Sequence, residues 1–88
     1  MTDDTTESAY ARVRRVLWRQ GPDRVLVRRA GGEAFDLLGL AAMVWVALDA
    51  PSSLAELTEE LAELVPNVSG LEATLHDLVV RGLVEVTP

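Results

Sequence analysis

The stretch Gly31–Leu48, with the sequence GGEAFDLLGLAAMVWVAL, joins two halves of the chain that differ in pattern. It opens with a glycine pair, alternates between apolar and polar residues, and becomes almost continuously apolar from Gly39 onward. Alternation with a period of two is typical of a strand, whereas a helix that is apolar on all sides is a buried one. We therefore predict a short strand that leads directly into a buried helix around Trp45.

The residues before this stretch predict two strands joined by a tight turn. Val13–Arg19 fits either a helix or a strand, and we favour a strand centred on Val16–Trp18 because the turn-forming sequence QGPD follows it at 20–23. Arg24–Arg29 then alternates as a second strand. For Trp18 two interpretations stay open, a core residue and a contact for a partner.

A third strand, Glu33–Leu37, is predicted after the glycine pair, which suits a tight hairpin turn. Phe35 and Leu37 share one face of this strand, and Ala34 and Asp36 share the other. As the last strand of an antiparallel meander, it lies at the edge of the sheet. One row of its N–H and C=O groups is then left without a partner.

The second half predicts three helices with apolar stripes at helical spacing, over Gly39–Asp49, Leu54–Val65 and Gly70–Arg81. Ser53 and Glu56 form a capping-box pattern, Ser69 can cap the third helix, and Gly82 is a natural stop. The apolar segment Leu83–Val86 is expected to lie back on the sheet or on the second helix. The predicted fold class is α+β, a three-stranded antiparallel N-terminal sheet followed by a three-helix, winged helix-turn-helix-like bundle.

Length and composition predict one small globular domain. The 88 residues are 49% hydrophobic and 25% charged, which is ordinary for a folded domain. We expect residues 1–9 to be a disordered acidic tail and residues 10–88 to be the domain. No apolar run approaches the ~20 residues that span a bilayer. The N-terminus lacks the basic-then-apolar layout of a secretion signal, so we expect a cytoplasmic protein with no membrane partner.

Charge is distributed unevenly along the chain. Residues 10–30 carry seven of the eight arginines and one acid, whereas residues 31–88 carry ten acids and one arginine. This asymmetry has two interpretations, and we favour complementarity within the molecule because surface ion pairs contribute little individually. The other interpretation is a bipolar surface that steers a charged partner.

The residue types that catalytic and metal sites need are sparse. The chain has no cysteine and a lone histidine, His76, with no nucleophile–base pair and no cluster of ligands. We therefore predict that the protein is not an enzyme and has no catalytic residues, no metal and no cofactor.

Most of the chain also resembles a known family. The resemblance rests on the segments Phe35–Leu37, Gly39–Trp45, Asp49–Ser53, Leu54–Leu61 and Leu75–Val84. Together, over about Val13–Val86, the chain resembles the PqqD-like family, which comprises the coenzyme PQQ synthesis protein D and the precursor-peptide recognition elements of ribosomal peptide natural-product (RiPP) pathways. Leu38 stands where the family usually has a polar helix cap, and Ala50-Pro51 stands where a glycine is common.

This resemblance implies a peptide-binding adaptor, a RiPP recognition element. Family members bind the leader segment of a precursor peptide, which adds as an extra strand to the third strand and lies in the groove between it and the third helix. They then present the precursor to a maturation enzyme such as a radical SAM protein, a leader peptidase or a cyclase. Strand addition takes its affinity from main-chain hydrogen bonds and its specificity from pockets for alternate side chains.

On this resemblance, the peptide-binding residues lie on the third strand and the third helix: Glu33, Ala34, Phe35, Asp36, Leu37, Leu75, Asp77, Leu78, Val79 and Arg81. Their apolar members would form the floor of the groove, and their charged members the rim, where charges tune rate and register. The same residues have structural interpretations, with Phe35 and Leu37 in the core and Asp77 and Arg81 as an ion pair within the helix. The free strand edge also leaves a homodimer open.

The alternative is a winged-helix DNA-binding regulator, in which Leu54–Val65 and Gly70–Arg81 form the helix-turn-helix and the strands form a wing. The recognition helix would then carry Glu72, Asp77 and Arg81, a charge balance that repels phosphate. Other candidates for nucleic-acid contact are the arginines at positions 12, 14, 15, 19, 28 and 29. We predict no nucleic-acid partner.

Overall fold

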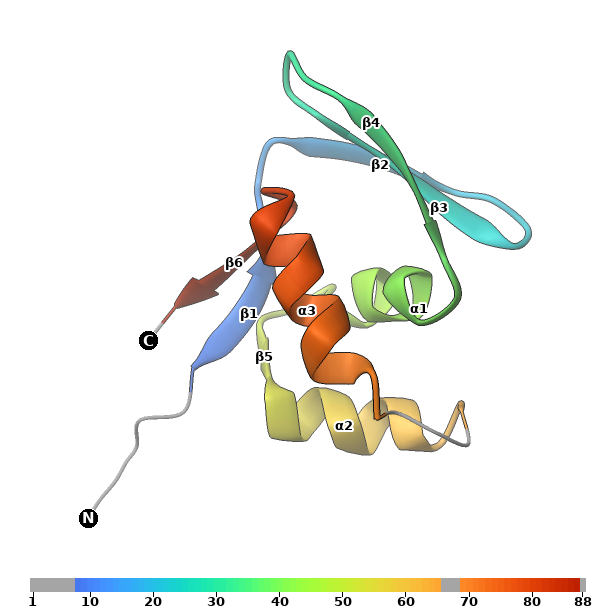
Figure 1. Ribbon diagram of the computed structural model, residues 1–88, viewed down its shortest axis with the longest axis vertical. Coiled ribbons are helices and arrows are strands. Elements are labelled where there is room, and N and C mark those ends of the chain that lie inside the picture. The colour runs from blue at the N-terminus through green and yellow to red at the C-terminus, as the bar shows by residue number, and fades with distance from the viewer. Residues whose placement is uncertain (1–7, 66–68, 88) are drawn as a thin grey trace.

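The computed structural model describes residues 8–65 and 69–87, which form an α+β fold with three helices and two three-stranded antiparallel sheets (Figure 1). In chain order the elements are β1 (Ala9–Arg12), β2 (Val16–Gln20), β3 (Arg24–Arg29), β4 (Ala34–Leu38), α1 (Gly39–Ala47), β5 (Ser52–Ser53), α2 (Leu54–Ala62), α3 (Leu71–Val80) and β6 (Val84–Thr87). The α+β class predicted from the sequence is confirmed. The second sheet is an addition that the sequence did not reveal.

The first sheet has the strand order β2–β3–β4 and forms from two local hairpins. Trp18 of β2 lies opposite Val27 of β3, which lies opposite Phe35 of β4. Alternation buries Val25 and Val27 on the inner face and leaves Leu26, between them, exposed. The predicted meander is therefore confirmed, although β2 runs on to Gln20 and β4 begins and ends one residue later than predicted.

The second sheet has the order β5–β1–β6 and joins the two ends of the described chain. Ala9 pairs with Thr87 on one side and with Ser53 on the other. Two predictions change as a result: Ala9 belongs to a strand although we expected a tail over residues 1–9, and Val84–Thr87 pairs with β1 rather than lying on the first sheet or on α2. Residues 1–7 lie outside the described residues.

The helix boundaries follow their local signals. Ser53 Oγ accepts a hydrogen bond from the Glu56 N–H at 3.1 Å, and Glu56 Oε1 accepts one from the Ser53 N–H at 2.8 Å, which confirms the capping box at the start of α2. Helix α1 ends at Ala47 and α2 at Ala62, so both are shorter than predicted. The N-cap of α3 is Gly70, where Ser69 was expected.

Helix α3 ends in the turn that its glycine predicts. Gly82 has a φ of 76°, its N–H donates to the Val79 carbonyl, and the Leu83 N–H donates to the Leu78 carbonyl, each at 3.0 Å. These two bonds make a Schellman motif, in which a residue with positive φ turns the chain out of the helix. The turn directs the chain into β6, so the helix stop and the second sheet depend on one backbone conformation.

The core lies where α1 meets the other layers. Figure 1 shows α1 between the β2–β3–β4 sheet and α2, with α3 packed beside it. Trp45 of α1 is fully buried, as predicted, and it packs with buried residues of the first sheet and of every helix. None of the helices within residues 8–65 and 69–87 is both long enough and apolar enough to cross a membrane.

Candidate functional site

Strand β4 is an edge strand of the first sheet, with β3 as its neighbour on one side. The Arg29 N–H donates to the Glu33 carbonyl at 3.2 Å, so the backbone groups of Glu33 face β3. Because backbone groups alternate in direction along an antiparallel strand, the N–H and C=O groups of Ala34 and Asp36 point away from β3. No other strand among the described residues pairs with that side of β4.

The side chains of β4 divide between the two faces of the sheet as predicted. Leu37 enters the core and is only 3% exposed, while Phe35 is half-buried. The guanidinium of Arg81, at the end of α3, lies 5.2 Å from the centre of the Phe35 ring. This cation–π contact brings the C-terminal end of α3 against β4. The structure therefore brings Arg81, just after α3, into contact with β4.

The predicted apolar floor is largely core. Leu75 and Leu78 of α3 are fully buried together with Leu37, so these three side chains hold α3 to the rest of the molecule and offer almost no surface. Val79 is half-buried against the same core. Near the predicted site, the accessible apolar surface of the floor is thus reduced to Phe35 and Val79, because a domain this small needs its leucines inside.

The predicted rim residues form surface ion pairs. Arg81 Nε lies 2.9 Å from Asp77 Oδ2 on the same helix, the i,i+4 pair that the sequence suggested. Asp36 Oδ2 lies 3.2 Å from the guanidinium of Arg24 on β3. Glu33 and Ala34, at the start of the strand, are exposed. The exposed position of these pairs means that each contributes little to stability.

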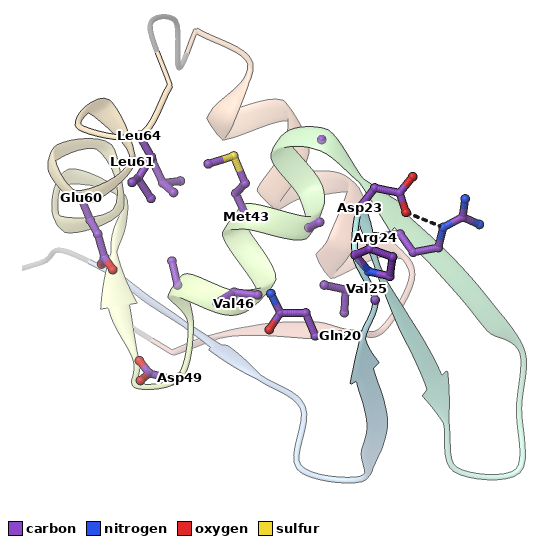
Figure 2. A pocket seen from close by; sticks show the side chains of 15 residues that line it. Gln20, Asp23, Arg24, Val25, Met43, Val46, Asp49, Glu60, Leu61 and Leu64 are labelled. Carbon is purple, nitrogen blue, oxygen red and sulfur yellow. Dashed lines mark hydrogen bonds and ion pairs between the residues drawn. The ribbon is translucent and has the colours of Figure 1, made fainter.

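A hollow of about 620 Å³ lies away from this edge, between the β2–β3 turn, α1 and α2 (Figure 2). We call it the α1–α2 hollow. Met43 and Val46 of α1, Leu61 of α2 and Leu64 just beyond α2 supply much of its apolar lining. No residue of β4 or α3 lines it. This site was not predicted from the sequence, where the available signal was Leu64, an apolar residue just beyond α2 that is 65% exposed.

Arg12 forms a cluster with two tryptophans where the two sheets meet. Its guanidinium lies 4.6 Å from the Trp18 ring centre and 5.2 Å from that of Trp45, and the two rings meet edge to face. It also donates to the Trp45 carbonyl at 2.7 Å and 2.9 Å and to the Val46 carbonyl at 3.2 Å. Burial lowers the pKa of Arg12, and the Asp49 carboxylate opposes that shift.

The contacts in this cluster define the roles of Arg12 and Trp18, for which the sequence left more than one interpretation. Arg12 was grouped with arginines that might contact nucleic acid, but it caps the C-terminal carbonyls of α1, where a cation is favoured. Trp18 packs against Trp45 and remains 40% exposed, so it belongs partly to the core and partly to the surface. Only the long-range contacts that β1 and β2 make with α1 could show these roles.

The described residues contain no group of three or more His, Cys, Asp and Glu side chains placed to hold a metal ion. His76 lies exposed on α3. Comparison of the chain with protein-family models, with curated proteins and with solved structures found no match.

Proposed function

We propose that the chain is a leader-peptide-binding adaptor that captures a ribosomal precursor peptide by strand addition at β4. The observation that carries this proposal is the edge of β4, which pairs with no further strand of the described residues and has the backbone groups of Ala34 and Asp36 pointing outward. Arg81, just after α3, contacts Phe35 of the same strand. The resemblance of the sequence to the PqqD-like family supports the same conclusion. The protein acts by binding and presentation, without catalysis, metal or cofactor.

A visiting strand would gain two kinds of interaction at this edge. Its main chain would bond to the outward N–H and C=O groups of Ala34 and Asp36, which supplies affinity without regard to sequence. Its inward side chains would meet Phe35 and Val79, and an acidic residue would meet Arg81. Because Leu37, Leu75 and Leu78 are buried, this contact is shallow, and most of the affinity comes from the backbone.

The bound precursor would be presented to a maturation enzyme, such as a radical SAM protein, a leader peptidase or a cyclase. The bundle that displays β4 has the order helix, strand, helix, helix, strand from α1 to β6, which supports a winged helix-turn-helix-like arrangement. Ribosomal precursors are made in the cytoplasm, so the proposal places the protein there.

The decisive experiment measures binding of fluorescein-labelled leader peptides from precursors encoded beside the gene. Fluorescence polarisation should give a Kd in about the micromolar range or tighter. Asp36→Pro removes an outward N–H that the β3–β4 ladder does not use, and an edge strand tolerates proline at such a position. We expect this variant to weaken binding at least about tenfold, since it removes one donor and crowds the incoming strand.

Asp36→Ala is the matched control, because it removes the carboxylate and keeps the N–H. Its affinity should stay within about twofold, since the Arg24–Asp36 pair is exposed. If no co-encoded leader binds, or if both variants weaken binding equally, strand addition at β4 is wrong. Sedimentation of the free protein tests the competing use of this edge, pairing with a second copy, which would appear as a concentration-dependent dimer.

The second candidate is a winged-helix DNA-binding regulator, which the element order from α1 to β6 favours. The exposed side of α3 argues against it, because Glu72 is exposed there and Arg81 is paired with Asp77. A basic footprint is the usual requirement for binding the phosphate backbone. A gel-shift assay at low salt with mixed-sequence duplex DNA should give no retarded band, and a band that persists at physiological salt would reverse this preference.

A further inference from the structure

The α1–α2 hollow has the dimensions of a site for a ligand group. Its volume of about 620 Å³ falls within the range of roughly 300–1,000 Å³ that is usual for small-ligand sites. Its walls come from three elements, the β2–β3 turn, α1 and α2, so its shape is set by the packing of the fold (Figure 2).

The middle of the hollow is apolar and accessible. Val46 is 38% exposed and Leu64 is 65% exposed, and both line the hollow together with Met43 (Figure 2). A flexible thioether such as Met43 adapts to side chains of different shape. A bulky aliphatic group placed here would remove the exposed surface of Val46 and Leu64 from water, which is favourable in proportion to the area covered.

The two ends of the hollow differ in how their acidic residues are paired. At one end Asp23 lies 3.2 Å from Arg24, which also pairs with Asp36 outside the hollow. At the other end lie Asp49 and Glu60, as Figure 2 shows. Arg12 interacts electrostatically with Asp49 and offsets part of its charge, while Glu60 has no ion-pair partner among the described residues. The net field at this second end is negative and favours a cation.

Gln20, at the end of β2, adds a group suited to a peptide. Its carboxamide lies beside Val46 in the lining of the hollow (Figure 2). The side chain makes no hydrogen bond to any residue within 8–65 and 69–87, so both its donors and its acceptor are available. A main-chain amide is the complementary partner, because it offers one donor and one acceptor.

We propose that the α1–α2 hollow binds a peptide segment of a partner protein in which a bulky aliphatic residue stands next to an arginine or lysine. The aliphatic side chain covers Val46 and Leu64, the cation lies by Glu60 and Asp49, and Gln20 bonds to the backbone between them. This contact goes beyond leader capture, because the hollow shares no residue with β4 or α3. The protein would thus hold two partners on separate surfaces.

The experiment titrates the full chain, labelled with ¹⁵N, with N-acetyl-Leu-Arg-amide and follows the amide signals by NMR. We expect saturable shifts at Met43, Val46 and Leu64, with a Kd in about the millimolar range for so small a probe. N-acetyl-Leu-Glu-amide should bind at least about threefold more weakly, because its charge is reversed. N-acetyl-Gly-Arg-amide should bind about tenfold more weakly, because it lacks the aliphatic side chain.

Two variants and one control locate the site. Glu60→Gln should weaken the Leu-Arg probe about two- to threefold. Leu64→Ala should weaken it by a similar factor, and it leaves the fold intact because Leu64 is largely exposed. Glu59→Gln is the control, since Glu59 lies on the same helix but lines a different hollow, beside Ala9. It should bind as the unaltered chain does.

The proposal is wrong if the Leu-Glu probe binds as well as Leu-Arg, or if the shifts lie outside the hollow. It is also wrong if Glu59→Gln and Glu60→Gln weaken binding equally, since that would show attraction to the acidic helix as a whole. Leader capture gives different NMR signals, so its failure can be distinguished from failure of this proposal. A strand added to β4 would shift the amide signals of Ala34 and Asp36 and leave those of Val46 and Leu64 unchanged.

Discussion

The two sheets of this protein are built from the same number of strands by opposite means. The β2–β3–β4 sheet joins neighbours along the chain through two short turns. The β5–β1–β6 sheet joins the first described strand to the last, and a hydrogen bond from Thr87 Oγ1 to the Ala9 carbonyl spans 78 positions in the sequence. Forming the first sheet closes only short loops, whereas forming the second brings together segments from opposite ends of the described chain, at a larger cost in conformational entropy.

The two sheets, although formed differently, are held together at a single place. The sheets meet at α1, where Arg12 of β1 lies over Trp18 of β2 and Trp45 of α1. A local sheet and a non-local sheet thus depend on one cluster of three side chains. Substitutions in this cluster should affect the whole domain, and substitutions within one hairpin should affect little beyond it.

The largest effect is expected from Trp45→Ala, which empties the centre of the core. We expect a loss of about 3–5 kcal/mol in the free energy of unfolding, measured by urea titration. That is a large part of the total stability of a small domain. Trp45→Phe should lose clearly less, since it keeps an aromatic ring and removes the indole N–H, which has no hydrogen-bond partner among the described residues. Equal losses in the two variants would show that packing at this position is not decisive.

Arg12→Ala should have the next largest effect, about 2 kcal/mol, because it removes the cap on the α1 carbonyls and the contact with both tryptophans. Arg12→Lys should recover only part of this loss, because an ammonium cannot reproduce the planar fork of donors. Arg14→Ala, at a neighbouring exposed arginine, should stay within about 0.5 kcal/mol in the same urea titration. A loss at Arg14 as large as at Arg12 would contradict the structural role of Arg12.

Two glycine substitutions compare the sheets directly. Gly82→Ala strains a φ of 76° at the entry to β6 and brings a methyl group to 3.2 Å from the Arg29 guanidinium carbon. Gly31→Ala strains a φ of 65° in the β3–β4 hairpin but meets no atom within 4 Å. We expect losses of about 2 kcal/mol at Gly82 and about 1 kcal/mol at Gly31 in thermal unfolding. The reverse order would show that the hairpin turn is the more demanding of the two.

The smallest effect is expected at the Arg24–Asp36 ion pair, which bridges β3 and β4 on the outer face of the first sheet. A double-mutant cycle with alanine at both positions should give a coupling free energy below about 0.5 kcal/mol. The coupling should decrease further in 1 M salt, where charges at the surface are screened. A coupling that is larger than this and insensitive to salt would indicate a buried pair, in conflict with the exposure of both side chains.

The sequence predicted the elements whose signals are local. Alternation located β3 to the residue, the Ser53–Glu56 pattern located the start of α2, and Gly82 located the end of α3. It did not predict the second sheet, because β1 and β5 are too short to show a period and pair across long stretches of chain. Nor did it separate Gly70 from Ser69 as the cap of α3, since a boundary shift of one residue is within the reach of tertiary packing.

The candidate site was predictable to the same degree. The edge position of β4 follows from its place as the last strand of a local meander, and the Asp77–Arg81 pair follows from helical spacing. The burial of Leu75 and Leu78 also follows from the stripe of α3, but which apolar residues remain at the surface does not. That division depends on how closely α3 packs against α1 and β6.

The amino-acid sequence by itself determined the helices, the meander and the capping of α2, because hydrophobic period, turn residues and caps act between residues that are close in the chain. Only the tertiary structure decided that Arg12 lies between two tryptophans, that β6 pairs with β1, and that a hollow opens between α1 and α2. These features depend on contacts between distant segments, whose geometry is set by the simultaneous packing of all elements around Trp45.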